Sequence, residues 1–303
     1  MHDIRTGTLR ENNSGGLVIK LILSDIDGTI LPYGEKQISP NMLQAIHEAQ
    51  EAGLYFAPCT GRGQPWLHSI FREDARTYAT CVAANGQSVY LNGKLLRQAE
   101  FSVAELLPLL EACFGRLNTG VYCFVEGIPH ILCGDRVVLA QSFAAYARGA
   151  VGHDYDGQHT LEELDADLAA LVGIDKVNVF TELDLAKTHE LCDELQQALP
   201  QWDFDVPNPG LLNVMKKGWN KAAGIDVLAE ALEISLDEVM VFGDGGNDVA
   251  MLRHVKHSVA VAGAVPEAAA VANWRTGRVE DDAVAHNIRA LSQGKFPFSS
   301  SVC

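Results

Sequence analysis

The feature that most constrains the fold is the segment LVIKLILSDIDGTIL, which runs from Leu17 to Leu31. Its first half is a run of Leu, Ile and Val broken only by Lys20, and this predicts a buried β-strand. The run stops at Asp25 and Asp27, and Gly28 follows at once. Two carboxylates at the end of the most apolar strand need an explanation, and the rest of the chain supplies one.

Helices and strands alternate after this first strand. Ser39 and Pro40 are typical of a helix start, and Gly53 marks the end of that helix. Strand, helix and strand at this spacing indicate βαβ units in a parallel sheet. The same alternation returns after residue 216. The further elements expected in this pattern are strands within 54–59, 78–83, 238–242 and 257–262, and helices over 220–232 and 266–273.

Between about residues 85 and 215 the pattern changes to hairpins mixed with helices. Asn92–Gly93 and Glu126–Gly127 are typical hairpin turns. The other elements expected here are helices near 102–114 and 184–199, and strands at 176–180 and 211–215. We therefore predict an α/β fold, a Rossmann-like doubly wound parallel-sheet core with an inserted α+β cap. The expected boundaries are a flexible leader at 1–16, the core at 17–84 and 216–303, and the cap at 85–215.

Composition narrows the classes of partner. The 303 residues carry a formal net charge of −16, which argues against nucleic acid and against a polybasic membrane surface. No run approaches the roughly 18 apolar residues of a membrane helix, and the polar leader is not a signal peptide. The seven cysteines form no CxxC pair, so we expect reduced thiols and a cytoplasmic protein. Nothing in the pattern indicates an oligomeric state.

Polar side chains follow four of the predicted strands. They are Asp25 and Asp27, Thr60 and Arg62, Asn85, and Asp244 with Asn247 and Asp248. Ligands of open parallel sheets bind beyond the carboxyl ends of the strands, so these side chains are expected to meet. Gathered carboxylates repel one another and usually need a cation. A cluster of oxygen ligands without His or Cys favours Mg²⁺ over Zn²⁺, and the position of Gly28 excludes an EF-hand.

Mg²⁺ held by one or two carboxylates normally shares its coordination shell with a substrate phosphate. Thr60 and the backbone N–H of Gly61 can bind phosphate oxygens, and Asn247 can donate another hydrogen bond. Lys221, at the start of a predicted helix, supplies a positive charge. One carboxylate can then attack phosphorus, while a second acts as general acid and base.

These motifs together resemble the haloacid dehalogenase (HAD) superfamily, and within it the Cof-type phosphatases with a C2B-type cap. DIDGT resembles the first motif, CTGR the second, Lys221 the third and GDGGND the fourth. The four occur in the family's order along nearly the whole chain. The resemblance implies a phosphoric monoester hydrolase that works through an aspartyl-phosphate.

The resemblance also implies individual roles. Asp25 is expected to attack phosphorus and to bind Mg²⁺. Asp27 is expected to act as acid and base, with its backbone carbonyl on the metal. Asp244 is expected to bind the metal directly, and Asp248 to bind it or to orient Lys221 beside it.

The remaining candidates are assigned to the phosphoryl group and to the substrate. Thr60 and Lys221 are expected to hold the phosphoryl group. Lys216 and Lys217 are alternatives to Lys221, which is preferred because it opens a helix. Arg62 and Asn85 are candidate substrate contacts, and a structural ion pair is an equal reading for Arg62.

The sequence thus predicts a Mg²⁺-dependent phosphatase that acts on small phosphorylated metabolites, with sugar phosphates as the expected substrates. One alternative is a sugar phosphomutase on the same fold. Another is a non-catalytic sensor or interaction protein, although such a protein should lack a nucleophile or a metal ligand. Here Asp25, Asp27, Lys221, Asp244 and Asp248 are all present.

Overall fold

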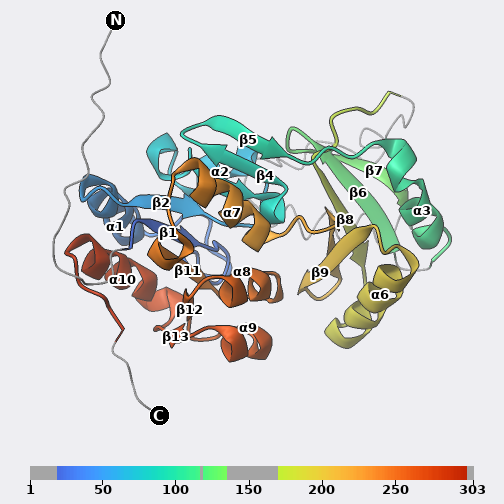
Figure 1. Ribbon diagram of the computed structural model, residues 1–303. Coiled ribbons are helices and arrows are strands. Elements are labelled where there is room, and N and C mark those ends of the chain that lie inside the picture. Colours follow the sequence, from blue (N-terminus) through green and yellow to red (C-terminus); the bar gives the residue numbers. More distant parts are fainter. Residues whose placement is uncertain (1–18, 117–118, 135–169, 299–303) are drawn as a thin grey trace, which may run out of the picture.

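The computed structural model describes residues 19–116, 119–134 and 170–298; the expected leader lies outside them. Figure 1 shows a parallel sheet flanked by helices, joined to a second part built on an antiparallel sheet. The strands are β1 (Leu21–Ser24), β2 (Tyr55–Pro58), β3 (Cys81–Ala83), β4 (Ser88–Leu91), β5 (Lys94–Gln98), β6 (Thr119–Val125), β7 (Ile128–Gly134), β8 (Lys176–Thr181), β9 (Trp202–Asn208), β10 (Leu211–Lys216), β11 (Val239–Gly243), β12 (His257–Ala260) and β13 (Trp274–Arg275). The α-helices are α1 (Pro40–Glu51), α2 (Leu67–Ile70), α3 (Val103–Cys113), α6 (Leu185–Ala198), α7 (Lys221–Ala231), α8 (Val249–His254), α9 (Pro266–Val271) and α10 (Ala283–Ser292).

The parallel sheet has the strand order β13-β12-β11-β1-β2, and each neighbouring pair runs parallel. The apolar first strand therefore lies inside the sheet, between β11 and β2, as its composition predicts. It is shorter than the apolar run, because pairing covers only Leu21–Ser24. The carboxyl ends of β1, β2 and β11 consequently meet at one edge.

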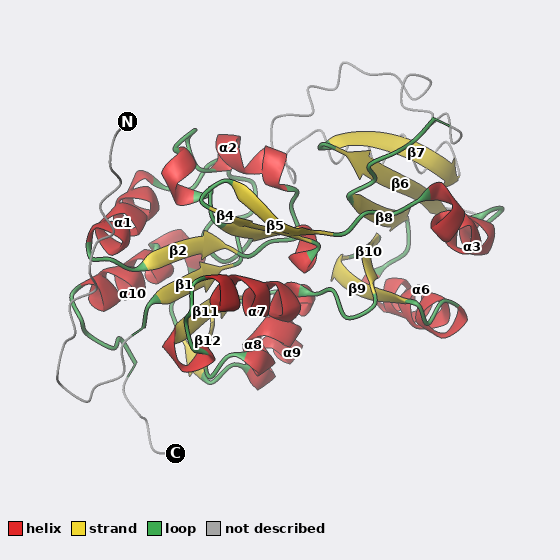
Figure 2. Ribbon diagram, turned by 45° about the horizontal axis from the view of Figure 1, so that its top comes forward, coloured by secondary structure: helices red, strands yellow, loops and turns green. Residues whose placement is uncertain are grey.

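Helices cover both faces of this sheet, as Figure 2 shows. On one face, Ile22 belongs to a hydrophobic cluster with residues of α1 and α10. On the other face, Leu21 and Leu23 belong to a second cluster with Ile225 of α7 and Met251 of α8. Successive β1 side chains thus enter opposite cores, which confirms the doubly wound α/β core.

Helix α1 begins as its sequence predicts. The Ser39 hydroxyl accepts a hydrogen bond from the N–H of Met42, and Pro40 occupies the first helical position. Capping satisfies a backbone donor that the helix itself leaves unpaired. The buried face includes Met42 and Ile46, so the amphipathic pattern also matches.

The third predicted strand differs from expectation. β3 is not part of the five-stranded parallel ladder, and it pairs antiparallel with the hairpin β4–β5. A single parallel bridge, Cys59 to Val82, links it to the segment after β2. The sequence predicts this hairpin as part of the cap, but Val89 of β4 packs with Val82 and Ile225 in the core. The boundaries 84/85 and 215/216 stay a prediction, and this packing favours a crossing after Gln98.

The cap is built on a sheet with the order β7-β6-β8-β10-β9, in which all pairs run antiparallel. Helices α3 and α6 lie on its outer side in Figures 1 and 2. The turn between β6 and β7 has positive φ at both Glu126 (51°) and Gly127 (82°), as a two-residue hairpin turn requires. None of the helices in the described ranges is long and apolar enough to cross a membrane.

Candidate active site

A cavity of about 500 Å³ lies between the carboxyl edge of the parallel sheet and the cap sheet. Both parts of the fold contribute side chains to its wall. Those from the parallel-sheet side include Asp25, Asp27, Tyr33, Thr60, Gly61, Arg62, Asp244 and Asn247. Those from the cap sheet include Lys176, Asn178, Phe180, Thr181, Leu211 and Asn213. The strand-end residues that the sequence singled out, except Asn85 and Asp248, therefore line one cavity with residues that it did not.

The loop after β1 passes directly over the second acidic loop. Gly28 has φ of +80°, and a Cβ there would lie 2.3 Å from Oδ2 of Asp244. Only glycine permits both this backbone conformation and this close approach. The next residue, Thr29, donates its hydroxyl to Oδ1 of Asp244 at 2.6 Å. The Gly-Thr pair of DIDGT thus joins the two loops.

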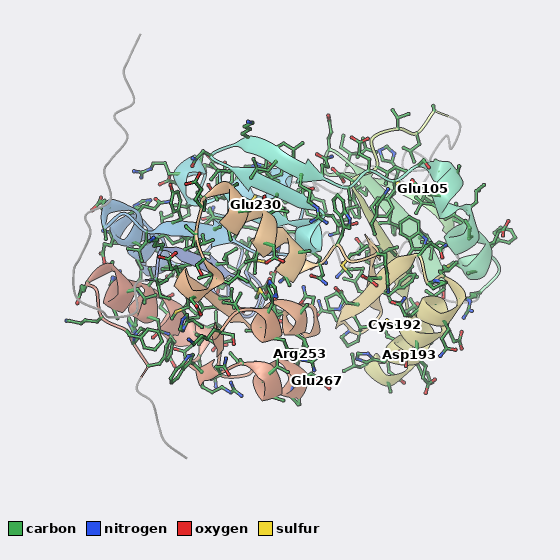
Figure 3. All side chains as sticks on the ribbon, viewed as in Figure 1. Glu105, Cys192, Asp193, Glu230, Arg253 and Glu267 are labelled. Carbon is green, nitrogen blue, oxygen red and sulfur yellow. The ribbon has the colours of Figure 1, made fainter. Side chains whose placement is uncertain are left out.

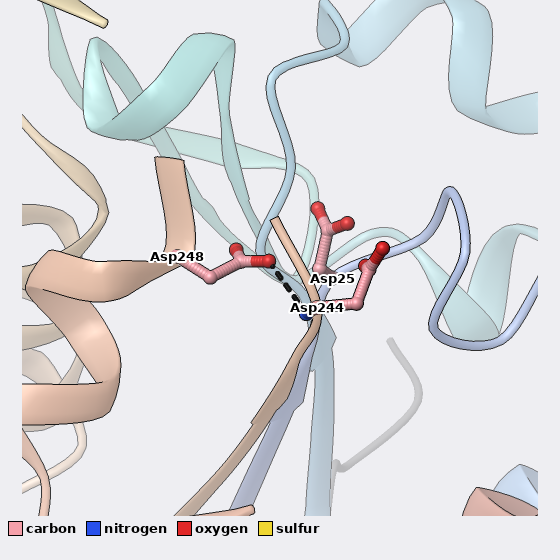
Figure 4. Close-up of side chains that lie close together, drawn as sticks. All are labelled: Asp25, Asp244 and Asp248. Carbon is pink, nitrogen blue, oxygen red and sulfur yellow. Dashed lines mark hydrogen bonds between the residues drawn. The ribbon is translucent and has the colours of Figure 1, made fainter. Parts of the chain in front are cut away.

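Asp25, Asp244 and Asp248 form a buried acidic cluster, shown in Figure 4. Each offers one carboxylate oxygen, and these oxygens all lie within 4.8 Å of one another. Burial and the charge of Asp248 raise the pKa of Asp25 well above its usual value. The same two causes raise the pKa of Asp244 to about 6. Concentrated negative charge of this kind, with oxygen ligands only, fits a hard divalent cation such as Mg²⁺.

Asp248 also organises the protein around it. Its Oδ2 accepts the backbone N–H groups of Asp244 and Gly245, each at 2.9 Å. Its Oδ1 accepts a hydrogen bond from Nζ of Lys221 at 2.5 Å. A Cβ at Gly243 would lie 2.7 Å from the Asp248 carboxyl carbon. Asp248 thus ties Lys221 to the backbone of the loop that carries Asp244.

Lys221 lies beneath the cluster and is fully buried. It opens α7, whose first turn is capped by the side chain of Asn220. Its Nζ lies 2.6 Å from Oδ1 of Asp25. Burial disfavours the charge of Lys221, but Asp248 and Asp25 outweigh that effect and the pKa of Lys221 is raised. The ammonium therefore stays protonated and offsets part of the carboxylate charge.

The two alternative lysines lie elsewhere. Lys216 pairs with Glu105 at 3.2 Å, and Figure 3 shows Glu105 on α3 of the cap. Lys217 pairs with Asp203 at 2.6 Å. Of the three lysines, Lys221 is the one that reaches the acidic cluster.

Two glycines allow α7 to bring Lys221 this close. A Cβ at Gly86 would lie 2.0 Å from the carbonyl oxygen of Asn220, and one at Gly224 would lie 2.4 Å from Cγ1 of Val82. Glycine inside a helix lowers helix stability, so its presence in α7 suggests a packing reason. Gly224 within the predicted helix 220–232 is therefore a sequence signal for this close packing.

Arg62 holds Asp27 through two hydrogen bonds. Its Nε donates to Oδ2 at 2.8 Å and its second guanidinium nitrogen to Oδ1 at 2.6 Å. Arg62 is buried, whereas about a third of the Asp27 side chain (34%) is exposed to the cavity side. A bidentate pair fixes the carboxylate plane. Arg62 thus forms the ion pair that the sequence left open for it. Its partner, Asp27, is the residue expected to act as general acid and base.

Asn85 lies behind the cavity wall. Its side-chain oxygen accepts a hydrogen bond from Asn247 at 3.1 Å, and its amide stands 3.2 Å from where a Gly61 Cβ would lie. Ala84 and Asn85 both have positive φ, of 48° and 56°. Such backbone is costly outside glycine and tends to occur at functional sites. The geometry therefore favours Asn85 as a residue that positions Asn247 and Gly61, not as a substrate contact.

Sequence reasoning missed the cap side of the cavity. Lys176 lies 5.3 Å from the ring centroids of Trp66 and of Phe124, and burial together with Arg62 lowers the pKa of Lys176 to about 8. Asn178 follows two residues later on the same strand face. The alternation of polar and apolar residues in KVNVFT was the available signal.

Residues 22–288 match the model of a family described as haloacid dehalogenase-like hydrolase. The chain is 28% identical to the 5-amino-6-(5-phospho-D-ribitylamino)uracil phosphatase YbjI of Escherichia coli (strain K12), over 92% of this chain and 98% of that protein. It is 23% identical to the phosphatase of the same description, YcsE, from Bacillus subtilis (strain 168), over 89% of this chain and 95% of that one.

A solved structure shares the fold. It is described as the HAD subclass IIB sugar phosphatase BT4131, and it superposes with a TM-score of 0.71 at 22% identity. The match covers 88% of this chain and 96% of the other. Both parts of the fold described above are therefore common to the two proteins.

Proposed function

This chain belongs to the haloacid dehalogenase-like hydrolase family as a Cof-type phosphoric monoester hydrolase, and on that basis we propose that it hydrolyses small phosphorylated metabolites with Mg²⁺ as cofactor. The proposed course runs through an aspartyl-phosphate on Asp25. The observation that carries this proposal is the position of Asp25, buried at the end of β1, 2.6 Å from Lys221 and in the cluster with Asp244.

The residues would divide the reaction as follows. A carboxylate oxygen of Asp25 attacks phosphorus, and the bond from phosphorus to the leaving alcohol breaks. Asp27 gives its proton to the alcohol oxygen as that bond breaks. Asp27 then takes a proton from a water whose oxygen attacks phosphorus, and this releases phosphate and restores the Asp25 carboxylate.

Other groups of the chain hold the charges in place. Asp25, the Asp27 backbone carbonyl and Asp244 would hold Mg²⁺, with Asp248 beside them. When bound, Mg²⁺ offsets the negative charge of the phosphoryl group and of the carboxylates. Lys221 supports Asp25 from below. The hydroxyl of Thr60, the N–H of Gly61 and the amide of Asn247 would bind phosphoryl oxygens, since all three residues line the cavity.

We propose sugar or polyol phosphates as the substrate class. Two relatives are named for a substrate that carries a phosphoribityl group, and the solved relative is named a sugar phosphatase. The cap contributes polar side chains to the cavity wall opposite the acidic cluster. Residues 85–215 are proposed as the inserted segment, and within it the part after the hairpin β4–β5, which packs on the core, is proposed to set specificity.

A cytoplasmic location is part of the same proposal. The six cysteines in the described ranges are free thiols, four of them buried. This agrees with a reducing compartment.

The test is phosphate release from a panel of phosphorylated metabolites in the presence of Mg²⁺. The panel should contain sugar phosphates, polyol phosphates, a nucleotide and p-nitrophenyl phosphate. We expect release from sugar or polyol phosphates that disappears in Asp25→Asn, because an amide cannot form the acyl phosphate. Wild-type turnover by a folded Asp25→Asn protein would refute the mechanism.

A further inference from the structure

One rung of the cap sheet carries polar residues across three neighbouring strands. The register pairs Asn178 of β8 with Asn213 of β10, and Asn213 with Asp205 of β9. Asn178 and Asn213 both line the cavity. The residues beside them in the strands, such as Val177 and Val214, point into the cap's hydrophobic core. The rung Asp205–Asn213–Asn178 is thus a polar row on the sheet face that looks toward the acidic cluster.

Hydrogen bonds run along this rung in one direction. Nδ2 of Asn213 donates to Oδ1 of Asp205 at 2.6 Å, and Nδ2 of Asn178 donates to Oδ1 of Asn213 at 2.8 Å. An ionised carboxylate can only accept, so Asp205 forces Asn213 to turn its NH₂ group toward it. The Asn213 oxygen must then face Asn178 and accept from it. The charge at one end of the rung therefore sets the orientation of an amide two strands away.

This orientation leaves Asn178 with a free acceptor. Its Nδ2 also donates to the carbonyl oxygen of Leu212 at 3.2 Å, so its donors are occupied. Its Oδ1 is buried and has no hydrogen-bond partner within the described residues, although only 1% of the residue is exposed. The hydroxyl of Thr181, further along β8 and also in the cavity wall, has no partner in that part of the chain either. Buried polar atoms normally have partners, and leaving one unpaired is costly.

A donor cation lies on the same strand face. Lys176 is two residues from Asn178, and it makes no ion pair within the ranges the structure describes. The cavity wall thus presents an acceptor and a cationic donor side by side. A hydroxyl group matches both, because it donates one hydrogen bond and accepts others.

We propose that the side-chain oxygen of Asn178, whose orientation Asn213 and Asp205 fix, accepts a hydrogen bond from a hydroxyl group on the substrate's leaving group. Asn178 is then a specificity-determining residue, and Asn213 and Asp205 are positioning residues. The substrate class is a phosphomonoester of a polyhydroxylated alcohol. A leaving group without a donor at this position leaves the Asn178 oxygen unpaired. This inference rests on the phosphatase activity proposed above.

The first experiment compares Asn178→Leu with wild type on D-ribitol 5-phosphate, D-glucose 6-phosphate and p-nitrophenyl phosphate, with Mg²⁺ present. The aryl phosphate has no hydroxyl on its leaving group, so it reports on the chemical step without the proposed contact. We expect kcat/KM for the better polyol substrate to fall about tenfold to hundredfold, the range for an unpaired buried group. For p-nitrophenyl phosphate we expect a change of about twofold to threefold at most. Gln197→Leu, on the exposed side of α6, is the matched amide-to-leucine control.

The second experiment tests the direction of the hydrogen bonds along the rung. It can be carried out even if Asn178→Leu does not fold. Asn213→Asp places two carboxylates next to each other, and their repulsion should displace the side chain at position 213 from Asn178 and so lower kcat/KM for the polyol phosphate. In the double variant Asn213→Asp, Asp205→Asn, the single negative charge lies on β10 instead of β9, and the repulsion is removed. Without the repulsion, the carboxylate at position 213 can accept from both neighbours, so Nδ2 of Asn178 regains its partner and its side chain regains the wild-type orientation. We expect the double variant to regain most of the loss, while p-nitrophenyl phosphate responds little to either variant.

The outcomes separate the two proposals. A selective loss in Asn178→Leu, with recovery in the double variant, supports the inference. Equal losses for polyol and aryl phosphates, or a double variant no better than Asn213→Asp, would overturn it. Hydrolysis of the aryl phosphate by wild type without hydrolysis of any polyol phosphate would overturn it as well. A wild-type protein that releases phosphate from neither class would contradict the proposed function itself.

Discussion

Nζ of Lys221 lies 2.6 Å from Oδ1 of Asp25, and both side chains are buried. The same ammonium contacts Asp248, so one cation joins two carboxylates that are distant in sequence. The contact fixes the carboxylate of Asp25 at the end of β1 and offsets part of its charge. It therefore links the stability of the core to the chemistry proposed for its edge.

Replacing this cation should destabilise the fold. Lys221→Met leaves the carboxylates of Asp25 and Asp248 buried without their partner, and breaking a buried pair typically costs about 3–5 kcal/mol. Denaturant unfolding in EDTA measures this change. Lys217→Met is the control, because Lys217 is largely exposed and its ion pair with Asp203 should contribute about 1 kcal/mol at most. Equal losses in the two variants would show that the buried pair has no special role.

Metal removal should abolish activity. The oxygens of Asp25, Asp244 and Asp248 lie within 4.8 Å of one another, and a divalent cation would relieve their repulsion. We expect EDTA to stop phosphate release, Mg²⁺ to restore it, and Ca²⁺ to restore it poorly because Ca²⁺ prefers a larger and looser shell. Mg²⁺ should also raise the melting temperature, since it binds the folded chain. Full turnover and an unchanged melting temperature in metal-free buffer would contradict the metal site.

The role of Asp27 depends on the leaving group. Asp27→Asn should slow hydrolysis of polyol phosphates by about 10²–10⁴-fold, the usual effect of losing a general acid or base. The loss should be smaller for p-nitrophenyl phosphate, whose leaving group needs little protonation. Asp237→Asn is the control, because Asp237 is an exposed carboxylate just before β11, at the opposite end of that strand from Asp244. A loss of the same size for both substrates would argue against Asp27 as the acid.

Asp205 should make stability depend on pH. Burial raises the pKa of Asp205 to about 6, and the charge of Asp248 adds to this rise. The hydrogen bond from Asn213 and the positive charges of Lys221 and Lys176 oppose it. An acid whose pKa is higher in the folded state binds its proton more tightly there. The stabilisation that protonated Asp205 contributes is therefore lost as pH rises from about 4 to about 6.

The measurement is the melting temperature of wild type and Asp205→Asn across this pH range. We expect the variant to gain relative to wild type as pH rises between about 4 and 6, and the difference to level off above that range. A difference that is constant across the range would show that Asp205 has an ordinary pKa in the folded protein.

The residues at the strand ends could be found from sequence because each follows a recognisable local pattern. Asp25 and Asp244 end apolar strands, and Lys221 opens a helix that Asn220 caps. Parallel strands bring such ends to one edge whatever the details of packing. The parallel core and its two helical layers followed from the same alternation.

The cap side could not be found in this way. Asn178 meets Asn213 and Asp205 only because three strands, two of them separated from β8 by a helix, pair in one particular register. Register depends on long-range pairing, which a local pattern does not fix. The same reason explains why the sequence predicts the hairpin β4–β5 as part of the cap: its turn is local, but its pairing with β3 depends on packing.

The central claim is that Asp25 carries the phosphoryl group during turnover, and the most direct test is to locate that group. Asp27→Asn enzyme with Mg²⁺ and p-nitrophenyl phosphate should accumulate the intermediate, because the second step then lacks its base. The reaction is quenched in acid and digested, and the phosphorylated peptide is identified by mass spectrometry. We predict one phosphoryl group, on Asp25, that is absent when Asp25→Asn is added. A phosphoryl group on any other residue, or turnover of this enzyme without a phosphorylated peptide, would contradict the account.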